Sequence, residues 1–497
     1  GVTLRAMNEQ DRDPEARRNA DPPGAKKRRP TKRWESREYL RPASSALREF
    51  APFNTFYAEG RHLKVTDLDL GTPERPSVSP WRFCPVCDHA EPAGTSTAPP
   101  RCPRCATPGW DDAGQRHELV AFRVARSFTS QHESLTVDAS DDREEVRYRL
   151  ADLIDVRPEH WGGAKASTSP LFGVELLHGL TLREVNFGPE DDREDTARVA
   201  DKSVPAKGFV ACPECGRVQQ SARDPGEGER ADLSAHAVHC ARRRGTSVRK
   251  ELLSVWLARE VKSEAIRLLL PAATVDVDGA RSAFRAALML GLRRKFRGRP
   301  MHLEVKATSE PVADRGDARR TFLVLYDAVP GGTGYLRELW RTDGLRECLA
   351  LALEVLERCA CRHDPERDGC YRCLLGHHTA FEKVRPSRRR AVDLLRDALG
   401  AWSVLTEVLT LSEVSVDTLL ESELERRFVA VLQRHVTERG GTWTPTVHHG
   451  KSECARLTLG DETWLLEPQV DVAVSTGAVH HCRPDFVLWS QREGVLP

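Results

Sequence analysis

Cysteine residues recur in closely spaced pairs, an arrangement with which many proteins bind zinc. Cys84 and Cys87 form one C-x-x-C pair, and Cys102 and Cys105 form a second pair after an interval of fourteen residues. Each pair presents two thiolates from one tight turn, and two such turns complete a tetrahedron around one ion. Four thiolates leave no position open for a substrate, so the pattern predicts a structural zinc ribbon. Chance pairing and thiol redox chemistry are the alternatives.

A second set combines cysteines with a histidine. Cys212 and Cys215 form another C-x-x-C pair, and His236 and Cys240 follow further along the chain. Three residues separate His236 from Cys240, a common spacing around a single ion. His239 is adjacent to Cys240 and is the less favoured ligand. The pattern predicts a second zinc site, with a surface histidine as the alternative.

The third set consists of a C-x-C pair, Cys359 and Cys361, and a C-x-x-C pair, Cys370 and Cys373. A C-x-C pair is less usual than C-x-x-C, but four sulfurs at this spacing can still close a tetrahedral shell. The sequence therefore predicts zinc as the cofactor at three structural sites.

The elements that must position the third set can be read from the preceding residues. An apolar run at 321–326 predicts a strand, which the sequence Pro330-Gly-Gly breaks, and helical periodicity begins at Tyr335 and continues for about 25 residues. The turn at 331–334 could bind an anion through its N–H groups. It lacks the Gly-Lys-Ser/Thr ending of a phosphate-binding loop, so a plain strand-to-helix turn is the preferred interpretation.

These residues also carry a family resemblance. The sequence LYDAVPGGTGYLREL at 325–339, followed by C-x-C and C-x-x-C-L, resembles the zinc-binding C-terminal domain of unknown function in bacterial helicase and phage-defence proteins. That family includes the DISARM component DrmB, MrfA-like repair helicases and Druantia-type helicases. The resemblance covers roughly residues 250–400, and a weaker one covers 46–65. It implies a role in DNA processing and cysteine ligands at the third set.

Composition limits the class of protein. The 497 residues are 39% hydrophobic and 30% charged, which fits a chain of two to four soluble domains. No apolar run is as long as a membrane span, and the polar N-terminus shows no signal peptide. The sequence thus predicts a cytoplasmic protein whose cysteines are reduced and available for metal. The start at Gly1 without Met suggests a fragment of a longer protein.

The net charge is only +1, but basic residues are clustered. A predicted helix at 279–297 ends in cations that suit the helix dipole and could equally contact phosphates. Further basic residues flank the third cysteine set, where Tyr371 and Phe381 could either stack on unpaired bases or belong to the core. The sequence predicts DNA, single-stranded or at a duplex junction, as the partner of these cations: Arg293, Arg294, Lys295, Arg297, Arg388, Arg389 and Arg390.

The fold class expected is α+β, in several domains. Residues 251–270 are predicted to form an amphipathic helix that ends before Pro271. The predicted divisions are a basic linker or disordered tail at 1–45, a β segment with a zinc ribbon at 46–110, a β-rich region with a second zinc knuckle at 111–245, the helicase-associated zinc domain at 246–400, and a small nuclease-like α/β lobe at 401–497.

The C-terminal lobe resembles a PD-(D/E)xK or very-short-patch-repair-like nuclease. A predicted helix at 416–438 precedes strand-like segments, and the resemblance implies that Glu423 or Glu421 and Asp485 would hold Mg²⁺ near a scissile phosphate. The expected lysine is missing, because the corresponding residues are Glu493-Gly-Val. An active nuclease, an inactive lobe and a chance match to a small α/β packing unit therefore remain as alternatives.

Together these patterns predict the accessory C-terminal region of a superfamily-2-type DNA helicase in anti-phage defence or DNA repair. Gly450-Lys451-Ser452 has the ending of a phosphate-binding loop, but position 445, where the first glycine of that loop would stand, is Pro. The sequence therefore shows no motor, and whether the chain is an enzyme stays open. The motor would lie in cis or in a partner helicase. A Mg²⁺-dependent nuclease and a protein-binding scaffold for such a helicase are the alternatives.

Overall fold

The computed structural model describes most of the chain and divides it into two compact units, each treated by itself. The described residues are 1–10, 33–72, 74–94, 98–130, 146–168, 171–190, 195–219, 236–237, 240–246, 251–270, 277–298, 300–311, 319–364, 367–377, 384–414, 420–448, 451–468, 472–473, 481–482 and 486–490. Unit 1 comprises residues 1–164, 175–268 and 300–344, and unit 2 comprises the remainder.

Unit 1 begins with a small four-stranded sheet in the order β2-β1-β11-β5. β1 pairs in parallel with β11, and its alternate residues Val2, Leu4 and Ala6 are buried against α1 and its neighbours. Residues 2–10 and 33–41 are therefore strands, in contrast to the tail predicted for 1–45. The elements are β1 (Val2–Gln10), β2 (Arg33–Arg41), α1 (Ala43–Glu49), β3 (Thr55–Ala58), β4 (Arg61–Lys64), β5 (Asp67–Leu68) and β11 (Val124–Ser130).

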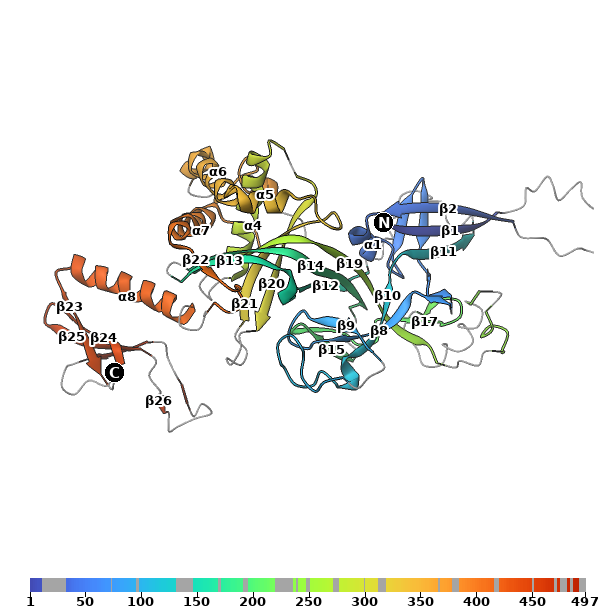
Figure 1. Cartoon of the computed structure of the whole chain (residues 1–497), viewed down its shortest axis with the longest axis horizontal. Coiled ribbons are helices and arrows are strands. Elements are labelled where there is room, and N and C mark those ends of the chain that lie inside the picture. The colour runs from blue at the N-terminus through green and yellow to red at the C-terminus, as the bar shows by residue number, and fades with distance from the viewer. Residues whose placement is uncertain are drawn as a thin grey trace, which may run out of the picture. The chain divides into compact units, whose positions relative to one another are not determined.

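A larger mixed sheet forms the rest of the unit 1 core (Figure 1). Its long neighbouring strands are β14 (Leu171–Pro189) and β19 (Leu253–Leu269), and β10 (Arg116–Ala121), β8 (Val78–Phe83) and β9 (Ala90–Pro92) continue the order. Other members are β12 (Tyr148–Asp155), β13 (Trp161–Thr168), β17 (Phe209–Ala211), β18 (Val218–Gln219), β20 (Leu303–Pro311) and β21 (Arg319–Asp327), while β15 (Thr196–Val199) and β16 (Lys202–Pro205) form a separate hairpin.

The helix predicted at 251–270 is wrong, because this segment is the strand β19. β19 lies inside the sheet, with β14 and β10 among its neighbours, and both of its faces are largely covered. Strands buried on both faces read as nearly continuous apolar runs, which periodicity alone cannot distinguish from a helix. Its polar residues Glu264 and Arg267 are buried, and both take part in ion pairs.

The helix of about 25 residues predicted after Tyr335 is also interrupted. The chain forms α5 (Tyr335–Arg341) and then α6 (Gly344–Arg358). Asp343 between them has a φ of 53°, a left-handed conformation that cannot continue a right-handed helix. The predicted strand at 321–326 is confirmed within β21, and the predicted helix at 279–297 corresponds to α4 (Val277–Lys295).

Unit 2 contains α4, most of α6 and α7 (Arg388–Ala401), together with the short strand β22 (Thr406–Val408). The backbones of α4 and α6 approach closely, since a Cβ added at Gly291 would lie 2.1 Å from the carbonyl oxygen of Cys348. α7 buries Ala391, Leu395 and Ala398 along one face.

The last part of the chain pairs a helix with an antiparallel sheet. α8 (Leu420–Glu438) precedes strands in the order β23-β24-β25-β28, and Val436, Leu457 and Leu466 form its core. The bounds of these strands are β23 (Thr442–His448), β24 (Lys451–Leu459), β25 (Glu462–Pro468) and β28 (Phe486–Ser490), with a further pair β26 (Val472–Ala473) and β27 (His481–Cys482). Among the described residues, no helix combines the length and apolar character needed to cross a bilayer.

Candidate metal centres

The first cysteine tetrad lies in unit 1, between the strands β8 and β9 and in the loop that follows them. Cys84 Sγ lies 3.6 Å from Cys105 Sγ, and Cys87 Sγ lies 3.7 Å from Cys102 Sγ. A tetrahedron with zinc–sulfur bonds of about 2.3 Å has sulfur–sulfur edges of about 3.8 Å, whereas a disulfide bond measures about 2.05 Å. The four sulfurs therefore have the separation of zinc ligands rather than of disulfide partners.

The local backbone supports this tetrad. The N–H groups of Val86 and Cys87 donate to Cys84 Sγ at 3.4 Å, and the N–H of Arg104 donates to Cys102 Sγ at the same distance. The close contacts among the thiols also shift their pKa values in opposite directions. Hydrogen bonding, first with Cys102, holds the pKa of Cys105 well below its usual range and raises that of Cys87.

The second tetrad is more deeply buried. Cys212 Sγ lies 3.9 Å from Cys240 Sγ, and His236 Nδ1 lies 3.3 Å from Cys215 Sγ and 3.8 Å from Cys240 Sγ. All four residues are buried. The structure therefore brings His236 into the set, as predicted, while His239 lies outside the described residues.

The third tetrad lies in unit 2, where α6 ends. Cys359 Sγ is 3.5 Å from Cys370 Sγ, and Cys361 Sγ is 3.7 Å from Cys373 Sγ. Three of these residues are partly exposed and Cys373 is buried. The C-x-C pair can contribute both of its sulfurs to one site because Cys361 lies in the single-turn helix η3 (Ala360–His363). This turn brings Cys361 Sγ to 3.4 Å from Cys359 Sγ.

In each tetrad, the four ligand atoms lie within 4.8 Å of one another. The first and third sets each offer four thiolates, and the second offers three thiolates and one imidazole, which matches the preferences of zinc. The three sets are thus consistent with three zinc sites, as the sequence predicted. Four protein ligands fill a tetrahedral shell, so the chemistry available is structural: each ion would link two turns of chain and would leave no place for a reacting water.

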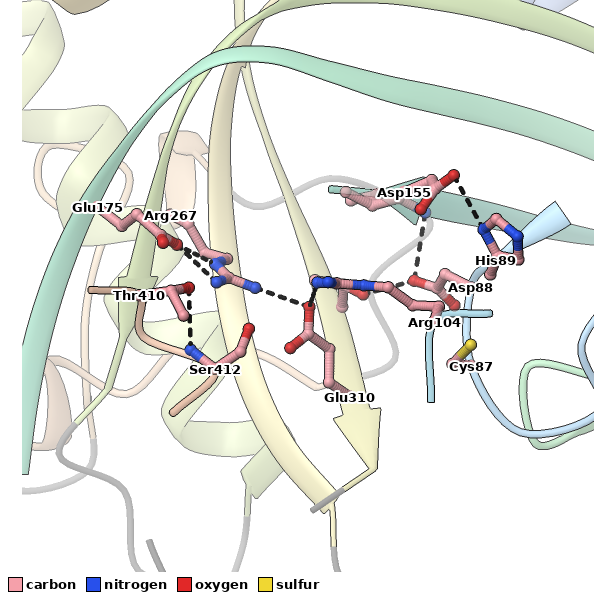
Figure 2. A network of polar contacts seen from close by, with 12 residues as sticks. Cys87, Asp88, His89, Arg104, Asp155, Glu175, Arg267, Glu310, Thr410 and Ser412 are labelled. Carbon is pink, nitrogen blue, oxygen red and sulfur yellow. Dashed lines mark hydrogen bonds and ion pairs between the residues drawn. The ribbon is translucent and has the colours of Figure 1, made fainter. Parts of the chain in front are cut away.

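The first site is joined to the core of unit 1 by buried and partly buried polar side chains (Figure 2). Arg267 donates to Glu175 at 2.6 Å and to Glu310 at 2.7 Å, and Arg104, which lies between two cysteine ligands, contacts the same oxygen of Glu310 at 3.4 Å. This chain of contacts was missed from the sequence because its members are far apart along the chain. The signal available was the presence of charged residues inside apolar runs.

A second connection uses Asp88, which directly follows Cys87. Its carboxylate accepts hydrogen bonds from the hydroxyl of Thr308 and from the backbone N–H of Ile154. Burial raises the pKa of Asp88 to about 6, against the opposing effect of the Thr308 hydrogen bond. The neighbouring His89 contacts Asp155 at 3.2 Å. The knuckle is thereby held against β12 and β20.

The glycine-rich turn at 331–334 is occupied by the protein's own carboxylates. Asp327 accepts the backbone N–H groups of Val329 and Thr333, at 2.9 and 2.7 Å, and Glu264 accepts that of Gly334 at 2.9 Å. These carboxylates take the N–H groups of Thr333 and Gly334, which an anion at the start of α5 would need. The structure thus favours the plain strand-to-helix turn over an anion cradle.

The basic residues predicted to bind DNA lie at two separate places in unit 2. Arg293, Arg294 and Lys295 end α4, where Lys295 pairs with Glu347 at the start of α6. The second cluster begins α7, close to position 282 of α4, because Ser282 donates to the carbonyl of Val384. The two clusters are therefore separated by about 20 Å along α4, at 1.5 Å for each residue. Arg297 lies just beyond the end of α4, with a positive φ of 52°.

The second cluster, Arg388 to Arg390, is tied to the third zinc site through Asp368. The carboxylate of Asp368 accepts the backbone N–H of Arg389 at 2.9 Å and the hydroxyl of Ser387, whose own oxygen caps the helix by accepting from the N–H of Arg390. Because Asp368 lies two residues before the ligand Cys370, the zinc loop and the start of α7 form one local structure.

Tyr371 stands out beside this structure because 83% of its surface is exposed. It directly follows Cys370 and precedes Arg372, which is also exposed. The interpretation of Tyr371 as a core residue is therefore wrong. Phe381, the other predicted stacking residue, lies outside the described residues.

The residues implied by the nuclease resemblance receive no structural test. Glu421 and Glu423 fall on α8, but the orientation of their side chains is outside the description, and Asp485 precedes the first described residue of β28. The assignment of these acids remains a prediction.

Comparison with protein families finds one match that includes the third zinc site. Residues 284–374 match the family model of the MrfA Zn-binding domain, and this range includes all four cysteines of the third tetrad. No curated protein sequence matches the chain.

Among solved structures, the chain is similar to the DUF1998 helicase MrfA bound to DNA, with a TM-score of 0.35 and 12% identity over 80% of this chain and 34% of that chain. It is also similar to MrfA bound to DNA and AMPPNP, with a TM-score of 0.25 and 11% identity over 73% of this chain and 29% of that chain. The chain spans about a third of the length of these structures.

Proposed function

We propose that this chain is the zinc-stabilised, DNA-binding accessory region of a superfamily-2-type helicase system in the cytoplasm, acting in anti-phage defence or DNA repair. It would hold single-stranded or junction DNA near a motor in cis or in a partner protein. The match of residues 284–374 to the MrfA Zn-binding domain supports the helicase association.

The observation that carries the DNA-binding part is the exposed Tyr371 on the third zinc loop. A tyrosine that is 83% exposed buries little of its ring against the described protein, whereas unpaired bases stack on such rings between cations that track the phosphates. Exposed cations lie on both sides of it in the sequence, at Arg367 and Arg372, and Arg389 is joined to the same loop through Asp368.

The test is binding of a fluorescent oligothymidylate to the zinc-loaded chain, measured by anisotropy over a range of salt concentrations. Stacking contributes about 1–3 kcal/mol for each base, so Tyr371→Ala is expected to weaken binding roughly 5- to 150-fold. Tyr371→Trp should retain affinity because it keeps a stacking face. The wild-type affinity should fall linearly on a logarithmic salt scale, as phosphate contacts require.

Tyr57→Ala is the matched control. Tyr57 is also exposed, at 44%, but it lies on the strand β3, which is far in sequence from the cysteine ligands. Equal affinities of wild type and Tyr371→Ala would contradict the proposal. Absence of any salt-sensitive binding would favour the protein-binding scaffold. If the wild-type chain instead cleaved the oligonucleotide in the presence of Mg²⁺, and Asp485→Ala abolished this cleavage, the chain would be a nuclease.

A further inference from the structure

Unit 1 contains a cavity of about 340 Å³ whose walls carry several cationic or ionisable nitrogen groups. We call it the basic pocket and define it by Arg157, His160, His178, Arg183 and Lys262. No carboxylate is found among the described residues that line it; the others are glycines, Leu180, Thr181 and Ser263. Its size is at the lower end of the range for small-ligand pockets.

Three elements hold the walls in place. Arg157 directly precedes the turn η2 (Pro158–His160), which ends with His160 and follows β12, and His178 to Arg183 lie along β14. The third wall is β19 with the turn after β21: the N–H of Gly331 donates to the carbonyl of Lys262 at 2.9 Å, and Ser263 donates to the carbonyl of Val329 at 3.2 Å. The pocket is therefore built on sheet strands rather than on an isolated loop.

Two glycines make room for the imidazole rings. A Cβ at Gly162 would lie 2.8 Å from His178 Nε2, and a Cβ at Gly179 would lie 3.2 Å from the ring of His160. Each ring thus lies close to the backbone of a glycine, so a larger residue at position 162 would require the His178 ring to move, and one at position 179 would crowd the ring of His160. The local sequence is in this way adapted to holding two histidines at the pocket wall.

Arg183 is the buried member of the pocket, with 4% of its surface exposed. Its Nε lies 2.9 Å from Glu260, its guanidinium group lies over the ring of Trp81 at 4.7 Å, and its Nη1 meets no hydrogen-bond acceptor among the described residues. Burial lowers the pKa of Arg183, against the attraction of Glu260. A buried guanidinium with an unused donor is costly unless an anion supplies the missing acceptor.

Three neighbouring carboxylates, on Asp155, Glu159 and Glu260, balance the three cations in number, but most of their contacts are long. Glu260 also approaches Lys262 at 3.5 Å, and Arg157 lies 3.7 Å from Asp155 and 3.9 Å from Glu159. Charge-assisted hydrogen bonds are about 2.7–2.9 Å long, so these three contacts are loose. Lys262 and Arg157 therefore keep donors available at the rim.

We propose that the basic pocket binds a phosphate group, carried either by a nucleic-acid strand or by a free phosphate ester. Phosphate presents acceptor oxygens in several directions, which suits converging guanidinium, ammonium and imidazole donors. The inference is independent of the stacking role of Tyr371, which belongs to the other unit. Either of the two proposals can fail without the other.

The experiment uses the zinc-loaded full chain and two probes, inorganic phosphate in a calorimetric titration and a fluorescent oligothymidylate in an anisotropy titration. The double variant Arg157→Ala/Lys262→Ala removes two partly exposed cations, with 47% and 75% of their side chains exposed, so folding should be preserved. Arg75→Ala/Lys207→Ala is the matched control, because it removes two exposed cations of the same unit outside the pocket. Arg183→Lys tests the buried guanidinium while keeping its charge.

Phosphate is expected to bind the wild type and the control equally, and at least about tenfold more weakly to the pocket double variant. If the phosphate belongs to a strand, the double variant should also weaken oligonucleotide binding and reduce its logarithmic salt slope by about 1.4, for two lost contacts. Loss of phosphate binding with unchanged strand affinity would assign the pocket to free phosphate esters. If neither probe distinguishes the pocket variant from the control, the proposal is wrong.

Discussion

At the scale of single residues, Arg267 is a charge held by contacts on several sides. Its side chain is fully buried on β19, where it pairs with the equally buried Glu175 and with Glu310, and its guanidinium group lies 4.3 Å above the ring of Phe322. An ion pair removed from water on all sides depends on both partners, because either one alone would be a buried, uncompensated charge.

Arg267→Met should therefore destabilise the protein by about 3–5 kcal/mol, since it leaves Glu175 buried without its partner. The measurement is the free energy of unfolding in urea with zinc present. The double variant Arg267→Met/Glu175→Gln should recover part of the loss, because it removes the stranded charge. Arg5→Met is the control: the Arg5–Glu38 pair has the similar distance of 2.9 Å but is exposed, so its loss should change stability by less than about 1 kcal/mol. Equal effects of the two single changes would contradict this account.

At the scale of elements, local patterns predicted some segments well and others incorrectly. The strand at 321–326 and the helix at 279–297 were found because their apolar periodicity agrees with their environment. The segment 251–270 was mistaken for a helix because its polar residue Arg267 forms a buried ion pair with Glu175, which is far away in the sequence but lies on the neighbouring strand β14. The strand β1 was missed for a related reason: its parallel partner β11 begins only at Val124, so the pairing leaves no local signal in the sequence around residues 2–10.

The packing of α4 on α6 gives an element-scale prediction. Gly291→Ala would raise helix propensity by about 1 kcal/mol, but its methyl group would collide with the backbone of Cys348 at 2.1 Å. The helices would have to separate, so the net effect on unfolding free energy should be a destabilisation of about 1–3 kcal/mol. Thermal or urea unfolding of the zinc-loaded chain measures it.

Gly400 in α7 provides the matched control, because a Cβ there would meet no atom of the described residues within 4 Å. Gly400→Ala should therefore stabilise the chain by up to about 1 kcal/mol through helix propensity alone. If the two substitutions shifted stability in the same direction, the close approach of α4 and α6 would not be the deciding contact.

At the scale of the whole molecule, the zinc sites were the most predictable feature. Each C-x-x-C or C-x-C pair is local, so its spacing alone indicates a knuckle, and only the pairing of knuckles needs the fold. The basic pocket could not be found in this way. Arg157, Arg183 and Lys262 come from three different segments of the chain, and neither their spacing nor their type distinguishes them from the other arginines and lysines of the sequence.

The three zinc sites should also differ in how readily they lose metal. All four ligands of the second site are buried, and the first site has one partly exposed ligand, whereas the third has three: Cys359, Cys361 and Cys370. A chelator must reach the ion or its thiolates, so we expect three zinc ions per chain, of which one is released in a distinct fast phase. Release can be followed with a coloured zinc indicator, and total zinc by mass spectrometry.

Cys361→Ser should identify that phase, because it removes one ligand of the exposed site and leaves the other two sites complete. The variant should contain two zinc ions and show only slow release. Since metal binding contributes directly to folding free energy, it should also free the turn that joins α6 to α7 and weaken oligonucleotide binding through Tyr371. If the fast phase persisted in Cys361→Ser, burial of the ligands would not decide the order of zinc release. If the wild-type chain held fewer than three zinc ions, at least one of the three assigned centres would be wrong.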